Sequence, residues 1–175
     1  PRDVADYDEL RRMRLDILRD PNLRLADIQA IIAEMDVLPG AYDFLTWARA
    51  QAPLIIITDS FYELLAPFLP KLDYTMAFAH SLVVDSRGML AGYRLRVVDG
   101  KRKALHSFRE LGFRTMAVGD SYNDIGMLEA ADVGVLFRPP DNVCRDYPAL
   151  PVTRDYPALQ QKITDFVHAA PPTAP

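Results

Sequence analysis

The chain has 175 residues, with 20 Lys and Arg against 24 Asp and Glu, a net charge of −4 and one cysteine, Cys144. This slightly acidic balance argues against nucleic acid as a main partner, because nucleic-acid binding needs a basic surface. One cysteine excludes an internal disulfide framework and a cysteine-rich metal site. No apolar run approaches the roughly 18 residues of a membrane-spanning helix. We therefore expect a cytoplasmic protein of one domain, with or without a small insert.

The first 38 residues predict a helical hairpin. Apolar side chains recur with helical spacing over residues 5–19 and again over residues 25–35. Pro21-Asn22 separates the two stripes, and Pro39-Gly40 follows the second. We expect residues 1–38 to form a helical segment without a strand of its own.

Beyond residue 40, helical patterns alternate with short apolar runs. In chain order we expect a helix over 42–50, a strand over 54–57, a helix over about 61–69, a β-hairpin with strands around 82–84 and 93–97, a helix over about 101–112, a strand over 115–118, a helix through Met127 and Leu128, a strand over 133–136 and a last helix to about Ala169. Short non-alternating apolar strands separated by helices indicate parallel strands buried on both faces. Residues 39–170 are therefore predicted to form a doubly wound α/β core, and residues 171–175 a disordered tail.

Two polar clusters follow predicted strands. In open α/β sheets, ligands bind at the carboxyl ends of the strands. Thr58-Asp59-Ser60 combines a hydroxyl with N–H groups that would open a helix, which suits a phosphate group. Asp120 and Asp124 could hold a hard divalent ion such as Mg²⁺ through one carboxylate while the other orients its neighbours. Helix capping is the alternative role for the hydroxyl residues, but it does not require both carboxylates.

Three segments together resemble a known family. The first segment is Thr58 after a strand, the second is Lys101-Arg102-Lys103 at a helix start, and the third is the Gly-Asp-Ser-x-Asn-Asp motif at residues 119–124. Their order and spacing resemble those of the haloacid dehalogenase superfamily. The similarity is greatest to its phosphoserine phosphatases, and within them to the branch that combines this activity with homoserine phosphotransfer. It extends from the first helix to about residue 165. It implies a haloacid-dehalogenase-like α/β core with a small helical cap formed by residues 1–38.

The resemblance implies Mg²⁺-dependent hydrolysis of phosphoserine through an aspartyl-phosphate intermediate, which water or an acceptor hydroxyl then discharges. In this scheme the Thr58 hydroxyl binds a phosphoryl oxygen. The backbone amides of Asp59 and Ser60 assist it. These three residues are therefore the expected phosphate site.

The resemblance also implies that Lys101 neutralises charge that develops on the phosphoryl group. Arg102 and Lys103 are rivals for this role, and a solvated helix start would explain all three basic residues. The expected register of the helix favours Lys101.

Five further positions receive roles from the resemblance. Asp120 would bind Mg²⁺, Asp124 would hold the local geometry, and Asn123 would touch the substrate. In the cap, Tyr7 and Arg14 lie seven residues apart on one helical face. Arg14 would clamp the amino-acid carboxylate in bidentate fashion, whereas an arginine on an apolar stripe otherwise extends to water.

The family's Asp-x-Asp/Glu-Gly motif, which holds the nucleophile and the general acid, is missing from these 175 residues. The chain begins at Pro1. The dipeptide Asp99-Gly100 does not complete the motif, because Val97 occupies the position of the first aspartate. We therefore expect the central strand that carries this motif to be absent and the polypeptide to have no phosphatase turnover. An incomplete sequence and a pseudoenzyme are both open, and the retained polar residues favour the former.

Other functions also fit parts of the sequence. Gly119-Asp120-Ser121 and Asp165-x-x-His168 imitate Gly-Asp-Ser esterases, with Ser121 as nucleophile and His168 as base. A phosphate-binding module without turnover is a second alternative. His80 comes singly, so we expect a structural role for it. Hydrolysis and transfer to homoserine are not separable here, and family analogy suggests a homodimer.

Overall fold

The structure, a computed structural model, describes residues 24–169. Packing divides the chain into two compact units. The hairpin unit comprises Asp6–Thr46 and Pro53–Val98, and the α/β unit comprises Pro1–Ala5, Trp47–Ala52 and Asp99–Pro175. Residues 24–38 thus group with the strands that follow them, and the functional boundary expected at residue 38 stays a prediction. The helix expected over 5–19 and the tail at 171–175 lie outside the described residues.

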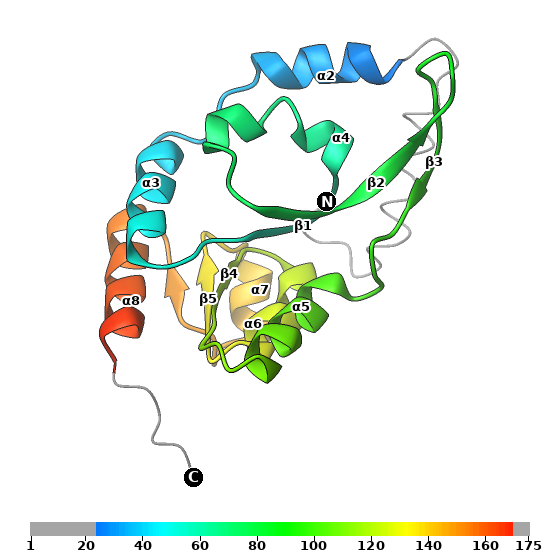
Figure 1. Cartoon of the computed structure of the whole chain (residues 1–175). Coiled ribbons are helices and arrows are strands. Elements are labelled where there is room, and N and C mark those ends of the chain that lie inside the picture. Colours follow the sequence, from blue (N-terminus) through cyan, green and yellow to red (C-terminus); the bar gives the residue numbers. More distant parts are fainter. Residues whose placement is uncertain (1–23, 170–175) are drawn as a thin grey trace. The chain divides into compact units, whose positions relative to one another are not determined.

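The hairpin unit contains a three-stranded sheet in the order β1-β2-β3 (Figure 1). Strand β2 (Ala77–Val84) runs parallel to β1 (Ile56–Phe61) and antiparallel to β3 (Leu90–Arg94). The predicted hairpin is confirmed, but β2 begins at residue 77 instead of 82 and β3 ends at residue 94. The early part of β2 is explained by its parallel pairing with β1, which leaves no alternating pattern in the sequence.

Strand β1 differs from its prediction at its carboxyl end. It was expected to stop before Thr58, yet it continues to Phe61. Its register with β2 shifts between Ile57 and Phe61, so residues 58–60 lie opposite a single residue, Ala79. Such a bulge disrupts the ladder locally and re-aims side chains. The first polar cluster therefore lies inside a strand and does not open a helix.

Helix α2 (Leu25–Glu34) confirms the second helix of the predicted hairpin. The helix expected over 61–69 is wrong, because only α4 (Tyr62–Leu65) and the 3-10 helix η1 (Leu69–Leu72) form there. Pro67 and Pro70 explain the difference, since proline removes a backbone donor and clashes with the preceding turn. Helix α3 (Ala41–Gln51) confirms the helix expected over 42–50.

The core of the hairpin unit joins α2 and α4 to the three strands. Its buried side chains are Ile28, Phe61, Leu82 and Leu90, and partly buried Leu25, Ile32, Leu64, Val84 and Tyr93 pack against them. Beyond the last β1 pair, the Glu63 carboxylate accepts the Leu82 N–H at 2.8 Å. Gln29 of α2 donates to the Glu63 carbonyl at 2.7 Å. Glu63 of α4 thus satisfies a β2 backbone N–H beyond the β1 pairing, and Gln29 ties α2 to α4.

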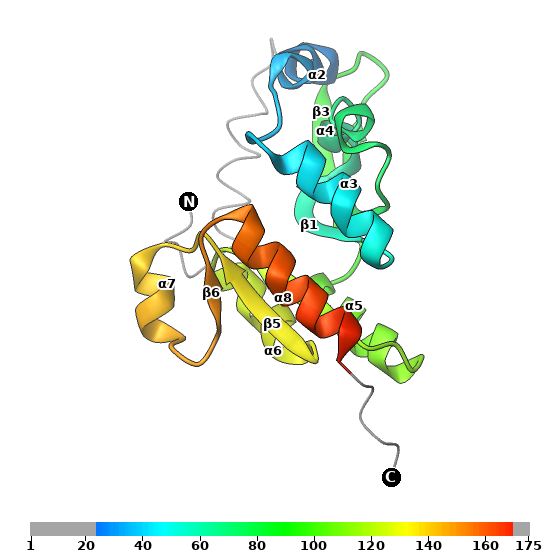
Figure 2. The ribbon, with the colours of Figure 1, turned by 90° about the vertical axis from the view of Figure 1, so that its left-hand side faces the viewer.

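The α/β unit contains three parallel strands in the order β4-β5-β6: β4 (Met116–Gly119), β5 (Val133–Phe137) and β6 (Val152–Thr153). Helix α8 (Tyr156–His168) lies on one face of this sheet, and α5 (Gly100–Glu110) and α6 (Ile125–Ala130) lie on the other (Figures 1 and 2). Helices on both faces of a parallel sheet are the doubly wound arrangement that the sequence predicts.

Two elements of the α/β unit were not predicted. Helix α7 (Asp141–Asp146) and the two-residue strand β6 fill the proline-rich stretch after β5. Both are too short to leave a periodic pattern. Among the described residues, β1 pairs only with β2 and β4 only with β5. The described strands thus form two three-stranded sheets, which agrees with the expected absence of a central strand.

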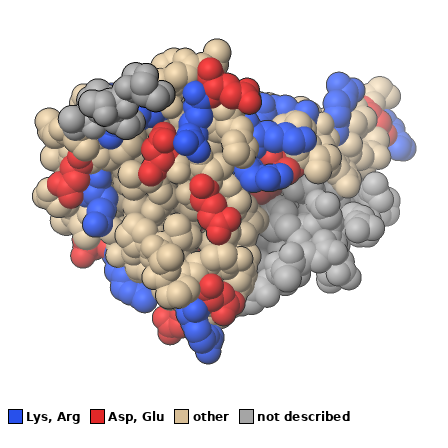
Figure 3. Space-filling model, turned by 90° about the horizontal axis from the view of Figure 1, so that it is seen from below, with Lys and Arg blue, Asp and Glu red and all other residues tan. Residues whose placement is uncertain are grey.

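Charges of both signs mix at the surface. On the face drawn in Figure 3, Lys and Arg side chains lie among Asp and Glu side chains. Within residues 24–169, none of the helices combines the length and the apolar character needed to cross a bilayer.

Gly134 of β5 allows α6 to approach the sheet closely. A Cβ at this position would lie 2.4 Å from the Leu128 carbonyl oxygen. We expect Gly134→Ala to lower the free energy of unfolding by about 1–3 kcal/mol, the usual cost of overpacking. Urea denaturation followed by circular dichroism measures this. Gly92→Ala is the matched control, because a Cβ there meets nothing within 4 Å. Equal effects in the two variants would contradict the packing argument.

Asp132 links the starts of β4 and β5. Partial burial raises its pKa, but hydrogen bonds from the Thr115 N–H and hydroxyl and the charges of Arg109 and Arg114 outweigh this, so the pKa lies below 3.8. A lowered carboxyl pKa contributes stability above the unfolded value near pH 4, and the contribution is lost as the pH falls through the folded pKa. We expect Asp132→Asn to be less stable at pH 7 and to lose less stability on acidification. Denaturation at pH 7 and pH 3 checks this, and parallel acid profiles would contradict it.

Candidate functional site

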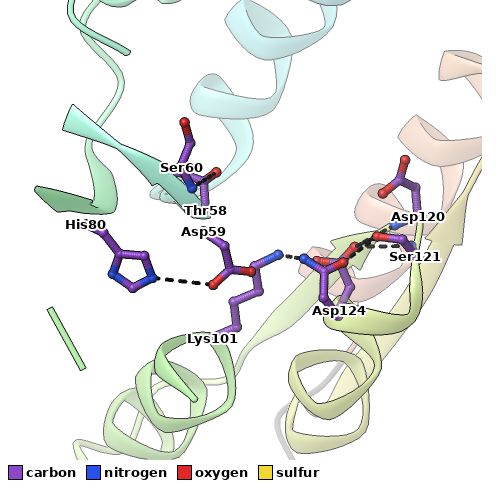
Figure 4. A network of polar contacts seen from close by, with 9 residues as sticks. Thr58, Asp59, Ser60, His80, Lys101, Asp120, Ser121 and Asp124 are labelled. Atoms are coloured by element: carbon purple, nitrogen blue, oxygen red, sulfur yellow. Dashed lines mark hydrogen bonds and ion pairs between the residues drawn. The ribbon is translucent and has the colours of Figure 1, made fainter. Parts of the chain in front are cut away.

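The carboxylate of Asp124 organises the turn that follows β4. Its Oδ2 accepts hydrogen bonds from the Asp120 N–H at 3.0 Å, the Ser121 N–H at 3.2 Å and the Ser121 hydroxyl at 3.1 Å. Its Oδ1 accepts one from Lys101 Nζ at 2.7 Å (Figure 4). Asp124 is buried, so these donors replace the water that its charge would otherwise need. The 3-10 helix η2 (Tyr122–Asp124) is fixed in this way at the carboxyl end of β4.

Gly119 makes room for this carboxylate. A Cβ at position 119 would lie 2.4 Å from the Asp124 Cβ and 2.9 Å from its Oδ2. No side chain can occupy that space without displacing Asp124. The glycine at the head of the predicted motif is therefore explained by close approach of the acid.

The register of α5 distinguishes the three basic residues at its start. The side chain of Lys101 is 11% exposed and pairs with Asp124, whereas Arg102 and Lys103 are exposed. Arg102 pairs with Asp99, the N-cap of the same helix. Asp99 has a left-handed backbone with φ of 56°, and Gly100 already belongs to α5. Asp99-Gly100 is thus a helix start and not a nucleophile motif at the end of a buried strand.

Asp120 and Asn123 belong to the same turn. Asp120 is half-buried, and its carboxylate points away from Asp124 (Figure 4). The Asn123 side-chain oxygen accepts a hydrogen bond from the Ser121 hydroxyl. Carboxylate oxygens are the ligands that Mg²⁺ prefers, so Asp120 fits that ion, while both oxygens of Asp124 are already used. Within residues 24–169, no group of three or more His, Cys, Asp or Glu side chains is arranged to hold a metal ion.

In the hairpin unit, residues 58–60 form a compact local arrangement. The Ser60 N–H donates to the Thr58 hydroxyl oxygen at 3.1 Å. A hydroxyl that accepts a hydrogen bond can still donate its own proton. The Ser60 amide thus orients the Thr58 side chain, and its expected contact with phosphate stays a prediction.

Asp59 has a partner that sequence reasoning missed. Its Oδ1 lies 3.6 Å from Nε2 of His80 on β2, and the side chains are 15% and 6% exposed (Figure 4). The Arg96 N–H donates to the other ring nitrogen of His80, Nδ1, at 3.1 Å. Only the parallel pairing of β1 with β2 brings these residues together, and the sequence does not show that pairing.

Tyr122 also has a contact that the sequence does not reveal. Its hydroxyl donates to the Asp146 carboxylate of α7, and its ring packs edge-on to Tyr147. The hydrogen bond to Asp146 raises the pKa of Tyr122 above its usual value. The turn after β4 is therefore tied to α7 as well as to α5.

The predicted site residues are thus distributed over both units. Lys101, Asp120, Asn123 and Asp124 surround the turn after β4, Thr58, Asp59 and Ser60 lie in β1, and Tyr7 and Arg14 lie outside the described residues. The esterase alternative fails on geometry. The Ser121 hydroxyl bonds to Asn123 and Asp124. His168 Nδ1 lies 2.9 Å from the Thr164 carbonyl of its own helix.

Comparisons with known proteins agree on one family. The model of haloacid dehalogenase-like hydrolases matches residues 4–132. A phosphoserine phosphatase of Pseudomonas syringae pv. tomato is 40% identical over 169 residues, which is 97% of this chain and 70% of the relative. The phosphoserine phosphatase ThrH of Pseudomonas aeruginosa is 40% identical over 161 residues, which is 92% of this chain and 78% of that protein.

Solved structures of phosphoserine phosphatases share the fold. One from T. onnurineus has a TM-score of 0.69 at 26% identity and covers 93% of this chain and 74% of its own. A phospho-aspartyl intermediate analogue of a phosphoserine phosphatase has a TM-score of 0.74 at 21% identity, over 90% of this chain and 78% of its own.

The buried Lys101–Asp124 pair yields a stability prediction. We expect Asp124→Asn to lower the free energy of unfolding by about 3–5 kcal/mol, because it leaves a buried lysine without its counter-charge. Lys101→Met should cost less, since the backbone and hydroxyl donors to Asp124 remain. Urea denaturation measures both effects. Lys103→Met, an exposed position on the same helix, is the control and should change stability by less than about 0.5 kcal/mol. A neutral Asp124→Asn would contradict the role of the pair.

Proposed function

The chain belongs to the haloacid dehalogenase-like hydrolase family, and from that premise we propose that it carries the phosphate-binding, lysine and magnesium-ligand residues of a phosphoserine phosphatase. One observation carries the proposal: the buried pair of Lys101 and Asp124 fixes the turn that presents Asp120 at the carboxyl end of β4. The substrate is inferred from the two relatives that are 40% identical and named phosphoserine phosphatases.

In this proposal Thr58 binds a phosphoryl oxygen. The Ser60 N–H holds the Thr58 hydroxyl oxygen, and the hydroxyl keeps its own proton to donate to the ligand. A pre-oriented donor loses little entropy when the ligand arrives. Thr58 lies where the register of β1 with β2 shifts, and a bulge of this kind re-aims side chains.

Lys101 supplies the positive charge for the phosphoryl group. Phosphoryl transfer depends mainly on positioning and on electrostatic stabilisation of the transferred group. Asp124 orients the ammonium group through the 2.7 Å contact between its Oδ1 and Lys101 Nζ. In this proposal the same ammonium group binds a phosphoryl oxygen.

Asp120 would hold Mg²⁺, with Asn123 beside it as a contact to the substrate. When bound, the ion supplies further neutralisation of the phosphate charge. The protein's own contribution is to hold the Asp120 backbone through Asp124. Asp120 is the one residue of this turn that we assign as a ligand, so water, substrate or other residues would complete the coordination.

The covalent step needs an aspartate that attacks phosphorus and releases serine, after which water discharges the aspartyl-phosphate. The Asp-x-Asp/Glu-Gly motif that would supply it is not among these 175 residues. We therefore propose that this polypeptide binds phosphoserine without releasing phosphate. Transfer to homoserine in place of water would need the same aspartate. We also propose that Arg14 and Tyr7 recognise the amino-acid carboxylate, that the protein is cytoplasmic and that it forms a homodimer.

Titration with O-phospho-L-serine tests the function. Isothermal calorimetry should show binding that strengthens with Mg²⁺, and ³¹P NMR of the same samples should show no free phosphate. Asp120→Asn should remove the Mg²⁺ dependence. Asp141→Asn, at an acidic side chain that is 96% exposed in the same unit, should not. Absence of Mg²⁺-dependent binding would contradict the assignment. Release of phosphate would instead contradict the proposal that the nucleophile lies outside these residues.

A further inference from the structure

The 58–60 segment lacks regular backbone pairing, so its conformation depends on side chains. Strand β1 pairs with β2 at Ile57 and again at Phe61, and the register shifts between them. Figure 4 shows the Ser60 side chain on one side of the strand and the Asp59 carboxylate on the other, directed at His80. The Asp59–His80 contact therefore ties the bulge to β2 at the point where the ladder is interrupted.

His80 is itself fixed from the side opposite to Asp59. The Arg96 N–H donates to His80 Nδ1 at 3.1 Å, so Nδ1 carries the lone pair and the neutral ring has its proton on Nε2, toward Asp59. The guanidinium of Arg96 lies 4.6 Å from the centre of the Phe78 ring, two residues earlier on β2. The segment that follows β3 is thus anchored on β2 at two points, and its backbone selects the tautomer of His80.

The burial of His80 and Asp59 makes loss of this ring orientation energetically costly. The His80 side chain is 6% exposed, and its ring centre lies 6.2 Å from that of Phe61. The Asp59 carboxylate is 15% exposed and needs a nearby donor or positive edge to offset its lost hydration. At 3.6 Å the contact is longer than a hydrogen bond, so it acts through the electrostatic attraction of the N–H group for the carboxylate.

We propose that His80 is a positioning residue: through Asp59 it holds the 58–60 segment in the conformation that orients the Thr58 hydroxyl. The proposal goes beyond the assigned roles of Thr58 and Asp59, and it rests on the proposed function only for the statement that Thr58 binds phosphate. It predicts that the Nε2 N–H group of His80 is needed to orient Thr58, whereas Nδ1 is needed to accept the Arg96 N–H.

Two substitutions separate the two ring nitrogens. His80→Gln keeps an N–H donor near the Nε2 position and loses the acceptor for Arg96, whereas His80→Asn keeps the acceptor and loses the donor. The direct readout is hydrogen exchange of the Ser60 amide, which bonds to Thr58, followed by NMR on the full chain. We expect exchange about three- to tenfold faster in His80→Asn, the effect of losing one polar contact, and within about twofold of the parent in His80→Gln.

Binding of inorganic phosphate should follow the same order, with affinity reduced about three- to tenfold in His80→Asn only. Equal losses in both variants, a loss in His80→Gln alone, or no change in either would overturn the proposal. Asp59→Ala should speed Ser60 exchange as His80→Asn does, and the double variant should be no worse than either single one, because both remove the same contact. Additive effects would also overturn it.

Two controls keep the outcome unambiguous. If both His80 variants unfold, as judged by circular dichroism, Asp59→Ala alone decides, and unchanged Ser60 exchange in it overturns the proposal. Thr58→Val tests the underlying function separately through phosphate affinity. If that affinity is unchanged, the phosphate role of Thr58 is wrong, while Ser60 exchange in the His80 variants still judges the positioning role.

Discussion

The arrangement of the α/β unit depends on one buried carboxylate. Asp124 accepts two backbone N–H groups, one hydroxyl and the ammonium group of Lys101. A carboxylate out of water is stable only when such donors surround it. Three features follow from the need to surround the Asp124 carboxylate with donors. They are the absence of a side chain at Gly119, the inward register of Lys101 on α5 and the path of the turn that carries Asp120.

This part of the site could be predicted from the sequence because its contacts are local or follow from helical register. Asp124 binds groups three and four residues earlier in the chain, and a strand followed by Gly-Asp-Ser-x-Asn-Asp leaves little freedom to place them elsewhere. The choice of Lys101 over Arg102 follows from the face that α5 turns inward. The doubly wound packing of the α/β unit was also predictable, since its strands β4 and β5 are short continuous apolar runs.

The hairpin unit was harder to predict because its decisive contacts are non-local. Strand β2 pairs with β1 along its first half and with β3 along its second. A sequence pattern reports which residues are apolar but not which strand a segment will join, and a register shift places side chains where alternation would not. The strand position of residues 58–60 and the partnership of Asp59 with His80 both follow from that pairing. Two prolines, Pro67 and Pro70, likewise replaced one expected helix with two short ones.

The two acids that shape these clusters are held by chemically different partners. Lys101 and Asp124 form an ion pair, so the ammonium group is oriented and its charge is balanced by the carboxylate. His80 is held by the Arg96 amide in a tautomer that offers an N–H group to Asp59 without a full positive charge. In the proposed positioning role, His80 would only have to keep the Thr58 hydroxyl in place, which does not require a permanent cation. In the proposed function, Lys101 would neutralise phosphoryl charge, which does require one.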